Sequence, residues 1–170
     1  MNIPDKLLNF ECYDANSRNI AGVVDVTLPT LTFMTTSIVG AGIAGEIDSP
    51  AVGHVQSLTA TFNWRSLTRD NISYAAPQVY NFTVMGDVQF RQSAAIVHQN
   101  VTASFRCTPK SLNLGTFAVA SNTGTSIEYE VDRLQMEVAG RRILLVDKFN
   151  YIFEINGVNY LASSQRNIGR

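Results

Sequence analysis

The sequence predicts a mostly-β fold: an antiparallel β-sandwich or barrel in a single domain over residues 1–170, with one short helix and a long extended hairpin arm. Two observations carry this prediction. Apolar and polar residues alternate with a period of two along several segments, which is typical of half-buried antiparallel strands. Helical periodicity is scarce, and its best candidate is the stretch 66–77, which ends at Pro77.

The clearest alternation lies in residues 57–65, 80–91 and 101–108. In the first of these, Phe62 and Trp64 fall on the apolar face. Successive side chains of a strand point to opposite sides, so the remaining positions form a polar and weakly charged face. In the first two segments that face includes Ser57, Thr59, Thr61, Asn63, Asn81, Thr83 and Gln89.

Two strands change phase partway. The apolar positions are even-numbered from Val24 to Leu28 and odd-numbered beyond Pro29; they are odd-numbered up to Val131 and even-numbered from Leu134. A one-residue slip moves every side chain to the other face, so each switch implies a bulge or a sharp bend. This is expected of a long strand that leaves one sheet for another.

The stretch from 147 to 161 is ambiguous. Phe149, Tyr151, Phe153 and Ile155 give one apolar strand face, and the pair Asn156-Gly157 that follows is typical of a hairpin turn.

Composition excludes several function classes. The chain has thirteen basic and fourteen acidic residues, so it has no net positive charge that would attract a polyanion. Stable nucleic-acid binding is therefore not expected. Cys12 and Cys107 lack the spacing of a zinc or redox site and are expected to be reduced and buried. The N-terminus has no signal-peptide stretch and no run approaches a membrane span, so we expect a soluble protein without a membrane anchor.

Residues 40–45, GAGIAG, match the G-x-G-x-x-G fingerprint of dinucleotide-binding folds. That motif works only where the last glycine opens a helix, whose N-terminal amides hold the pyrophosphate. Here Pro50 and Gly53 follow closely, then the clearest strand, and Glu46 would repel a phosphate. We therefore expect no nucleotide or other cofactor.

The fingerprint instead lies in residues 36–54, an apolar, glycine-rich connection without a basic residue. Exposed apolar stretches mark interaction surfaces, and glycine lets another backbone approach closely. We predict an arm that lies on another protein. Its contact residues are Ile38, Val39, Gly40, Ala41, Gly42, Ile43, Ala44, Gly45 and Ile47.

No catalytic or metal-ligating residues are predicted. His54 and His98 have no Cys, Asp or Glu partner at a metal-ligand spacing, and each is expected to be a surface or hydrogen-bonded structural histidine. The acidic residues 128, 130 and 132 lie along one strand, which is typical of a solvated or partner-facing surface. We therefore expect that the protein is not an enzyme.

The two ends of the chain carry a family resemblance. The C-terminal stretch has Asp147 in a strand, then Asn156-Gly157-Val158, then Arg166-Asn167-Ile168-Gly169. Near the N-terminus, AGVVDVTLPTL precedes the glycine-rich arm and the strand LTATFNW. In this order, these pieces resemble the major tail tube protein of contractile-tailed phages, including the tubes of tail-like bacteriocins.

The resemblance implies a structural subunit that forms hexameric rings, which stack into a hollow tube with the inner sheets joined around a channel. It implies that the arm reaches a neighbouring subunit. Further implied partners are the sheath protein, baseplate and tail-terminator proteins, and tape-measure protein and DNA that pass transiently through the lumen. The tube would be assembled in the host bacterial cytoplasm, belong to a virion tail or tail-like particle, and be driven through a bacterial envelope.

The polar faces suit such a channel, because lysine or arginine contacts would hold passing DNA. The seven polar residues of the strands 57–65 and 80–91 are the candidates for lining it. Arg65, Arg91 and Arg106 on polar faces do not obviously agree and could sit at strand ends, paired with acids across an interface.

Three alternatives stay open. A DNA-free injection particle of the R-type bacteriocin kind and the tube of a secretion apparatus would share the architecture. A monomeric β-barrel that binds a small ligand would explain the alternating strands but not the arm.

Overall fold

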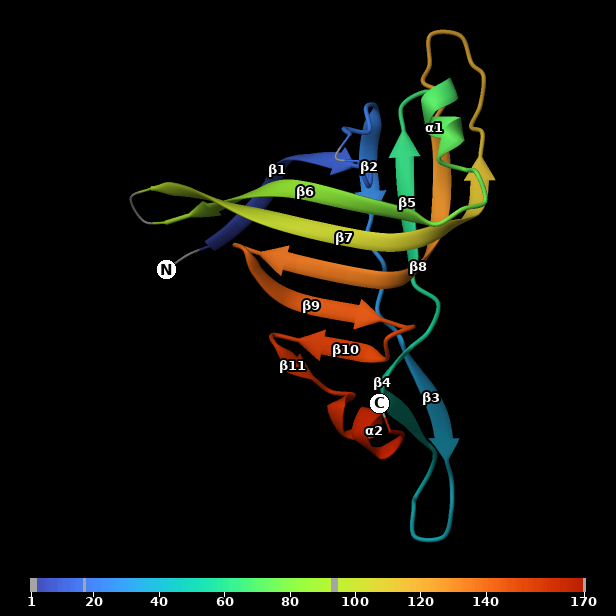
Figure 1. The fold of residues 1–170 in the computed structure, drawn as a ribbon, viewed down its shortest axis with the longest axis vertical. Helices are drawn as coiled ribbons and strands as arrows, with labels where there is room; N and C mark the ends of the chain where they lie inside the picture. The colour runs from blue at the N-terminus through green and yellow to red at the C-terminus, as the bar shows by residue number, and fades with distance from the viewer. Residues whose placement is uncertain (1–2, 17, 93–94, 170) are drawn as a thin grey trace.

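The computed structural model describes residues 3–16, 18–92 and 95–169, which contain eleven strands and two short helices (Figure 1). The strands are β1 (Ile3–Tyr13), β2 (Val23–Thr27), β3 (Phe33–Ile38), β4 (Ile47–Val55), β5 (Thr59–Trp64), β6 (Tyr80–Arg91), β7 (Ile96–Asn113), β8 (Thr125–Val138), β9 (Arg141–Asp147), β10 (Ile152–Ile155) and β11 (Val158–Asn159). The helices are α1 (Arg69–Ser73) and α2 (Ala162–Asn167).

Nine strands form one antiparallel sheet that bends into two layers, while β3 and β4 pair only with each other. The larger layer has the order β1-β6-β7-β8-β9-β10-β11, and the smaller layer has the order β2-β5-β8-β7. The strands of the two layers cross (Figure 1). The long strands β7 and β8 belong to both layers and form the corner between them.

The second phase switch marks this corner. Strand β8 pairs with β5 up to Glu130 and with β9 from Arg133 onwards. Its pairing with β7 skips Asp132, which is the extra residue of a bulge. Val131 and Leu134 are therefore both buried although they differ in parity. The predicted bulge is confirmed, but β8 passes between two layers of one sheet rather than from one sheet to another.

The first switch has a different cause. Pro29 lies between β2 and β3, which belong to different sheets. The first strand therefore ends before Pro29 and does not continue through a bulge. A register shift occurs earlier, between Val23 and Asp25. It leaves Val24 exposed while Val23 and Val26 pack against the core, so the predicted inward face of this strand is wrong at Val24.

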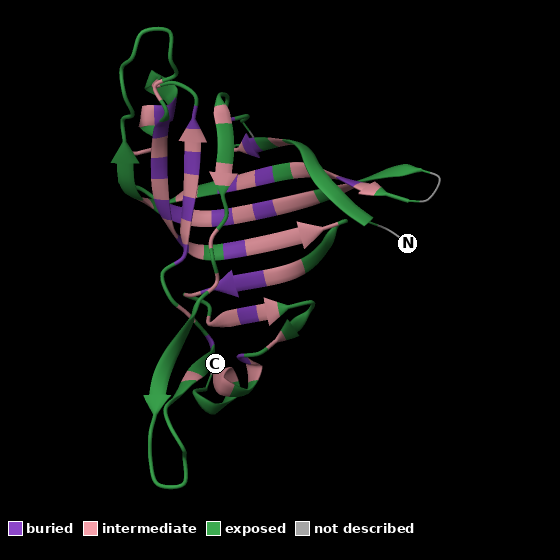
Figure 2. Cartoon of the chain, turned by 180° about the vertical axis from the view of Figure 1, so that it is seen from behind, coloured by how far each residue is buried: buried purple, intermediate pink, exposed green. Residues whose placement is uncertain are grey.

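The core lies between the two layers, where buried positions alternate along the strands (Figure 2). Phe62 of the smaller layer meets Phe82 and Phe105 of the larger layer, with ring centroids 5.1 and 6.2 Å apart. Tyr129 packs edge-on against Phe62 and donates a hydrogen bond to the Tyr74 carbonyl at 3.0 Å. The two layers therefore form a sandwich, with its polar faces outward.

Helix α1 lies inside the predicted stretch 66–77 and has a capping box. The Thr68 hydroxyl accepts from the Asn71 amide at 3.2 Å, and the Asn71 side chain accepts from the Thr68 amide at 2.9 Å. Helix α2 was not expected, so the prediction of a single helix is wrong. Among the described residues, no helix is long and apolar enough to cross a membrane.

The C-terminal strand is shorter than the alternation suggests. Strand β10 begins at Ile152, whereas Phe149 is exposed and Tyr151 has a φ of 57°. The predicted strand face therefore starts only at Phe153. The turn prediction is confirmed: Asn156 and Gly157 have φ values of 49° and 84° and connect β10 to β11, as a type I′ hairpin requires.

Candidate assembly surfaces

The predicted arm is the hairpin of β3 and β4, which projects from one end of the molecule (Figure 1). Ile38 pairs with Ile47 at the last rung, so the connecting loop is only residues 39–46. Every predicted contact residue from Ile38 to Gly45, together with Ile47, is exposed. The segment 36–54 thus presents an apolar surface that the rest of the chain leaves uncovered.

The glycine fingerprint lies in this loop between two strands. Gly42 and Gly45 have φ values of 91° and 126°, which glycine adopts far more readily than other residues. The chain continues into β4 rather than into a helix. The glycines therefore shape a hairpin tip, and the strand-to-helix setting that a phosphate loop requires is not present here.

The base of the arm is fixed by the C-terminal segment. A Cβ atom at Gly53, whose φ is 70°, would lie 2.7 Å from Cγ of Leu161, so the two segments touch closely. Nε2 of His54 lies 3.1 Å from the Tyr151 hydroxyl, which lies 3.1 Å from Oγ of Ser164. These contacts set the direction of the arm relative to the sandwich.

An apolar pocket of about 260 Å³, which we call the aromatic pocket, opens at the base of the arm. Its walls include Phe33 and Val52 from the arm and Phe153, Ile155 and Tyr160 from the C-terminal hairpin. The Phe33 and Phe153 rings meet edge to face, with centroids 5.5 Å apart. The arm and the C-terminal hairpin thus build one surface together.

The C-terminal motif contributes to this surface through its backbone. The Asn156-Gly157 turn directs the chain back so that the Tyr160 amide donates to the Phe153 carbonyl at 2.9 Å. Val158 is exposed. Arg166 and Asn167 end helix α2, Ile168 is exposed, and Gly169 has a φ of 78°. Arg166 in the last turn and the glycine behind it were the available signals for this helix.

The seven polar channel candidates do not share one face. Thr59, Thr61 and Asn63 lie on the outer side of the smaller layer, with exposed Ser57 just before them. Asn81 and Thr83 lie on the outer side of the larger layer, across the core. The two sets lie on different outer faces of the sandwich, and the lining of a channel stays a prediction.

Gln89 differs from the other candidates because its side chain is buried and donates to Oδ2 of Asp5 at 2.7 Å. It is used within the chain and does not lie on an open polar face.

Two of the three arginines on the predicted polar faces pair with acids of the same chain. Nε of Arg91 lies 3.1 Å from Asp5. Arg106 donates from Nε to Asp132 at 2.9 Å and from Nη2 to Asp147 at 3.2 Å. Arg65 is exposed at the end of β5, with no side-chain partner among the described residues. Arg91 and Arg106 therefore need no partner from another subunit.

Asp147 is the most buried acid of this group, with a side chain that is 3% exposed. Burial alone would raise its pKa. Hydrogen bonds from the Asn150 side chain and backbone, together with the positive charge of Arg106, outweigh burial and hold the pKa of Asp147 below its ordinary value. This carboxylate is therefore charged and anchors the corner of the sandwich.

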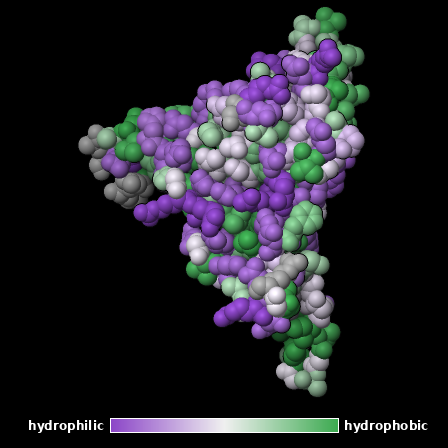
Figure 3. All heavy atoms as spheres, viewed as in Figure 1, coloured by the Kyte–Doolittle hydropathy of each residue, from purple (hydrophilic) through white to green (hydrophobic). Residues whose placement is uncertain are grey.

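The loop between the two longest strands presents two exposed apolar side chains. Residues 114–124 connect β7 to β8, and Phe117 and Val119 are 89% and 101% exposed. Hydrophobic residues gather at both ends of the longest axis, over this loop and over the arm (Figure 3). The stretch from Ser111 to Ile127 contains no charged residue, which was the one signal available in the sequence.

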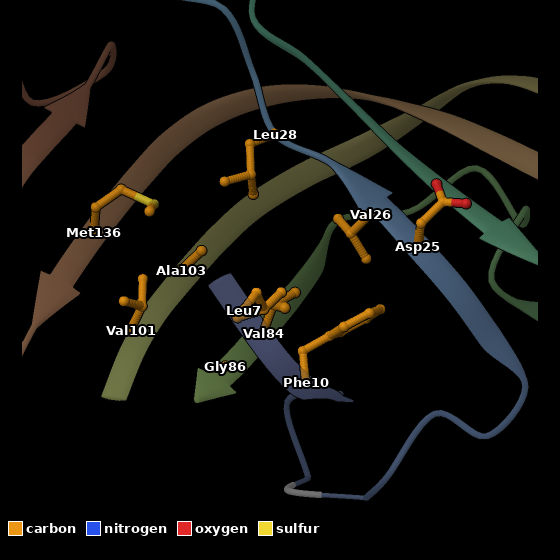
Figure 4. Close-up of a pocket in the computed structure, with 10 residues that line it drawn as sticks. All are labelled: Leu7, Phe10, Asp25, Val26, Leu28, Val84, Gly86, Val101, Ala103 and Met136. Atoms are coloured by element: carbon orange, nitrogen blue, oxygen red, sulfur yellow. The ribbon is translucent and has the colours of Figure 1, made fainter. Parts of the chain in front are cut away.

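An apolar groove of about 220 Å³ opens where the two layers separate (Figure 4). Val26 and Leu28 from the smaller layer face Leu7, Val84 and Met136 from the larger one. The groove is an end of the core that the chain itself leaves open.

Among the residues that the structure describes, no three His, Cys, Asp or Glu side chains are close enough to hold a metal ion. Nδ1 of His98 lies 2.8 Å from Oδ2 of Asp87, and His54 bonds to the Tyr151 hydroxyl as described above. Both histidines are exposed and hydrogen-bonded, as expected. Cys12 and Cys107 are buried and unpaired as predicted, and burial raises the pKa of each thiol to about 12.

Comparison with known proteins gives one family match. A family model described as "Phage tail tube protein FII" matches residues 4–169. No curated protein sequence matches the chain.

Three solved structures share the fold at low sequence identity. A chain in the sheath-tube complex of an extracellular contractile injection system, PVC, is 16% identical with a TM-score of 0.55; the match covers 79% of this chain and 91% of that one. A chain in the PVC sheath/tube terminator structure is 15% identical, with a TM-score of 0.54 and coverage of 79% and 96%. A chain in the 6-fold symmetrised baseplate of the anti-feeding prophage is 14% identical, with a TM-score of 0.53 and coverage of 81% and 97%.

Proposed function

The chain belongs to the phage tail tube protein FII family, a family of structural tube subunits, and on that premise we propose that its copies form rings that stack into the hollow tube of a contractile particle. The family match over residues 4–169 carries this proposal. The rings are hexameric, an expectation supported by the fold shared with a chain of a 6-fold symmetrised baseplate. The role is that of a building block without catalysis.

The outer face of the smaller layer lines the channel. One cross-strand row on this face is Thr27–Thr61–Glu128–Ser111, and the next is Asp25–Asn63–Ser126–Asn113. These rows contain acids and uncharged polar groups but no lysine or arginine. By contrast, the outer face of the larger layer carries Arg106, Arg133 and Arg142. Passing DNA would release fewer counterions, and so bind less, on the smaller layer.

The smaller layer is also suited to closure through its neighbours. Its four strands alternate in direction, and it ends at β2 on one side and at residues 108–113 of β7 on the other. A copy related by rotation would bring its β2 antiparallel to this part of β7. Val24 and Leu112, near these two edges, are 47% and 41% exposed. Pairing would remove both open edges, as closed barrels do.

The arm of residues 36–54 reaches an adjacent copy in the same ring or the next. Its uncovered apolar side chains support this role, because a free arm of this composition would promote non-specific association. Sheath, baseplate and terminator proteins then contact the assembled tube, a proposal supported by the sheath-tube, terminator and baseplate complexes in which the structural neighbours occur. The tube belongs to a virion tail or tail-like particle and is assembled in the host bacterial cytoplasm.

DNA, with tape-measure protein, is the proposed channel content. A DNA-free injection particle is the second candidate, favoured by the fold shared with extracellular contractile injection system chains. Particles isolated with this tube distinguish the two: nuclease-protected DNA in a capsid-bearing particle supports the first, and capsid-free particles without DNA support the second.

The experiment that tests the assembly shortens the arm without disturbing its base. Because Ile38 pairs with Ile47, residues 39–46 can be replaced by an Asn-Gly pair, which closes a two-residue hairpin. The matched control is Glu46→Gln, which keeps the arm length and changes an exposed loop residue that is not one of the predicted contact residues. Sedimentation velocity and negative-stain microscopy measure assembly, and circular dichroism measures folding.

We expect the wild-type chain and the Glu46→Gln variant to form rings or tubes, and the shortened chain to stay folded and unassembled. Normal tubes from the shortened chain would contradict the role of the arm alone. A wild-type chain that remains a monomer would contradict the tube itself.

A further inference from the structure

The loop 114–124 and the aromatic pocket lie toward opposite ends of the molecule. The loop stands at the upper end of the longest axis in Figure 1, and the pocket lies in the lower part, between β4 and β10. Neither surface is covered by the rest of the described chain. We propose that Phe117 of one copy inserts into the aromatic pocket of the next copy, in a head-to-tail contact that stacks the rings. This inference rests on the proposed tube function.

Hydrogen bonds hold the backbone at the base of the loop that carries Phe117. The Thr116 amide donates to the Thr123 carbonyl at 2.8 Å, and the Gly115 amide donates to the Asn113 side chain at 2.9 Å. The Gly124 amide donates to the Arg65 carbonyl at 3.2 Å, which ties the loop to the end of β5. A loop whose backbone is already ordered at its base loses less entropy on binding, so an aromatic side chain that it carries suits an anchor of an interface.

Close packing at the base of the loop supports the same conclusion. A Cβ atom at Gly115 would lie 2.0 Å from the Thr123 carbonyl oxygen, so only glycine fits there. The two sides of the loop are thereby held together, and the segment that bears Phe117 extends beyond the sandwich. Phe117 retains 89% of its exposure although the chain around it is fixed.

The pocket matches a phenyl ring in chemistry. Phe33 and Phe153 meet edge to face at 5.5 Å, and Phe153 and Tyr160 do so at 6.4 Å. Aromatic rings pack favourably in such edge-to-face clusters, so the pocket offers geometry beyond simple apolar burial. Pro50 and Val52 complete an almost wholly apolar lining. No charge on either surface would have to be desolvated.

The placement of the two surfaces identifies the occupant as a second copy. A knob at one end and a pocket toward the other form a heterologous contact, and such contacts repeat without closing when copies are stacked. Phe117 cannot reach its own pocket because the sandwich lies between them (Figure 1). The contact also gives the C-terminal motif a role, since the turn at Asn156-Gly157 connects Ile155 to the strand before Tyr160, and both of these residues line the pocket.

The first test replaces Phe117 by aspartate and compares it with Asn122→Asp, which adds the same charge to the same loop but keeps Phe117. Assembly is followed by the concentration at which the purified protein pellets as tubes. We expect Phe117→Asp to raise that concentration by at least about tenfold, a loss typical of an interface anchor. Asn122→Asp should assemble as the wild type does.

The second test detects the contact directly. Phe117→Cys and Val52→Cys are combined, and mild oxidation is followed by denaturing electrophoresis without reductant. Both native cysteines are buried, so they do not compete. A head-to-tail contact should give a ladder of covalent multimers in the double variant and monomers in each single variant. Dimers from Phe117→Cys alone would show that the loops meet each other, which overturns the proposal.

The outcomes separate the two claims. If wild-type protein assembles and Phe117→Asp assembles equally well, only this contact is wrong. If wild-type protein does not assemble at all, the tube proposal fails and the contact fails with it.

Discussion

Arg106 and Asp147 form an ion pair across the corner of the sandwich, with Nη2 and Oδ1 3.2 Å apart. The same guanidinium donates from Nε to Asp132, the bulge residue at which β8 leaves one layer for the other. Asn150 donates twice more to Asp147, at 3.1 and 2.7 Å. The bend that creates two layers is thus fixed by a nearly buried carboxylate and its donors.

Replacing Asp147 by asparagine should therefore destabilise the fold. The change removes the charge of one of the two carboxylates that Arg106 faces, and Asp132 remains as its partner. We expect a loss of about 2–3 kcal/mol in the free energy of unfolding, because charge-assisted hydrogen bonds of a nearly buried carboxylate are weakened. Urea unfolding of Asp147→Asn measures it. The control Asp48→Asn makes the same exchange at an exposed arm position and should stay within about 0.5 kcal/mol of wild type. Equal effects at both positions would contradict the account of the corner.

The same carboxylate predicts how stability depends on pH. The folded pKa of Asp147 lies below its ordinary value of 3.8, so the folded state holds the proton less tightly than the unfolded state. Its contribution to stability is present above that ordinary value and is lost as pH falls through the folded pKa. In urea unfolding from pH 6 down to about pH 3, the free energy of unfolding should fall more steeply with pH for wild type than for Asp147→Asn. Parallel curves would show that Asp147 does not carry this dependence.

Gly53→Ala should loosen the base of the arm. The substitution introduces a side chain where φ is 70° and where its Cβ would lie 2.7 Å from Cγ of Leu161. Strain at such a position costs about 1–3 kcal/mol. We expect a lower melting temperature and faster proteolysis within the arm. Gly40→Ala, whose new methyl group meets nothing within 4 Å, is the matched control and should change neither quantity. If the two variants behaved alike, the packing of Gly53 against Leu161 would be unimportant.

Both cysteines should be unreactive in the folded protein. Burial raises the pKa of each thiol to about 12, so little reactive thiolate is present near neutral pH. We expect an exposed-thiol reagent at pH 8 to label neither Cys12 nor Cys107 in native protein, and to label both in urea. Rapid labelling of either in native protein would mean that the core opens far more readily than its packing suggests.

The sequence was most informative where local pattern decides the structure. The parity change between Val131 and Leu134 predicts the corner of the sandwich, since one extra residue reverses which side chains face inward. The pair Asn156-Gly157 predicts a hairpin because its two positive φ angles suit these residues. Strand β1 escaped prediction because it is an edge strand with only Cys12 buried, which gives no alternation to detect.

The candidate surfaces depend on tertiary structure and were harder to predict. Thr61 and Thr83 look alike in sequence, and only the packing of two layers puts them on opposite faces. Gln89 fits the polar alternation, yet its partner Asp5 is far away in the chain. Phe117 lies in a stretch whose exposure follows from where the loop leaves the sandwich, which no periodicity encodes.

Electron cryomicroscopy of the purified wild-type chain tests the central claim most directly. The account predicts hollow tubes of stacked hexameric rings, with Thr61 and Glu128 facing the channel and the arm lying on an adjacent copy. Monomers that stay dispersed at high concentration would contradict it.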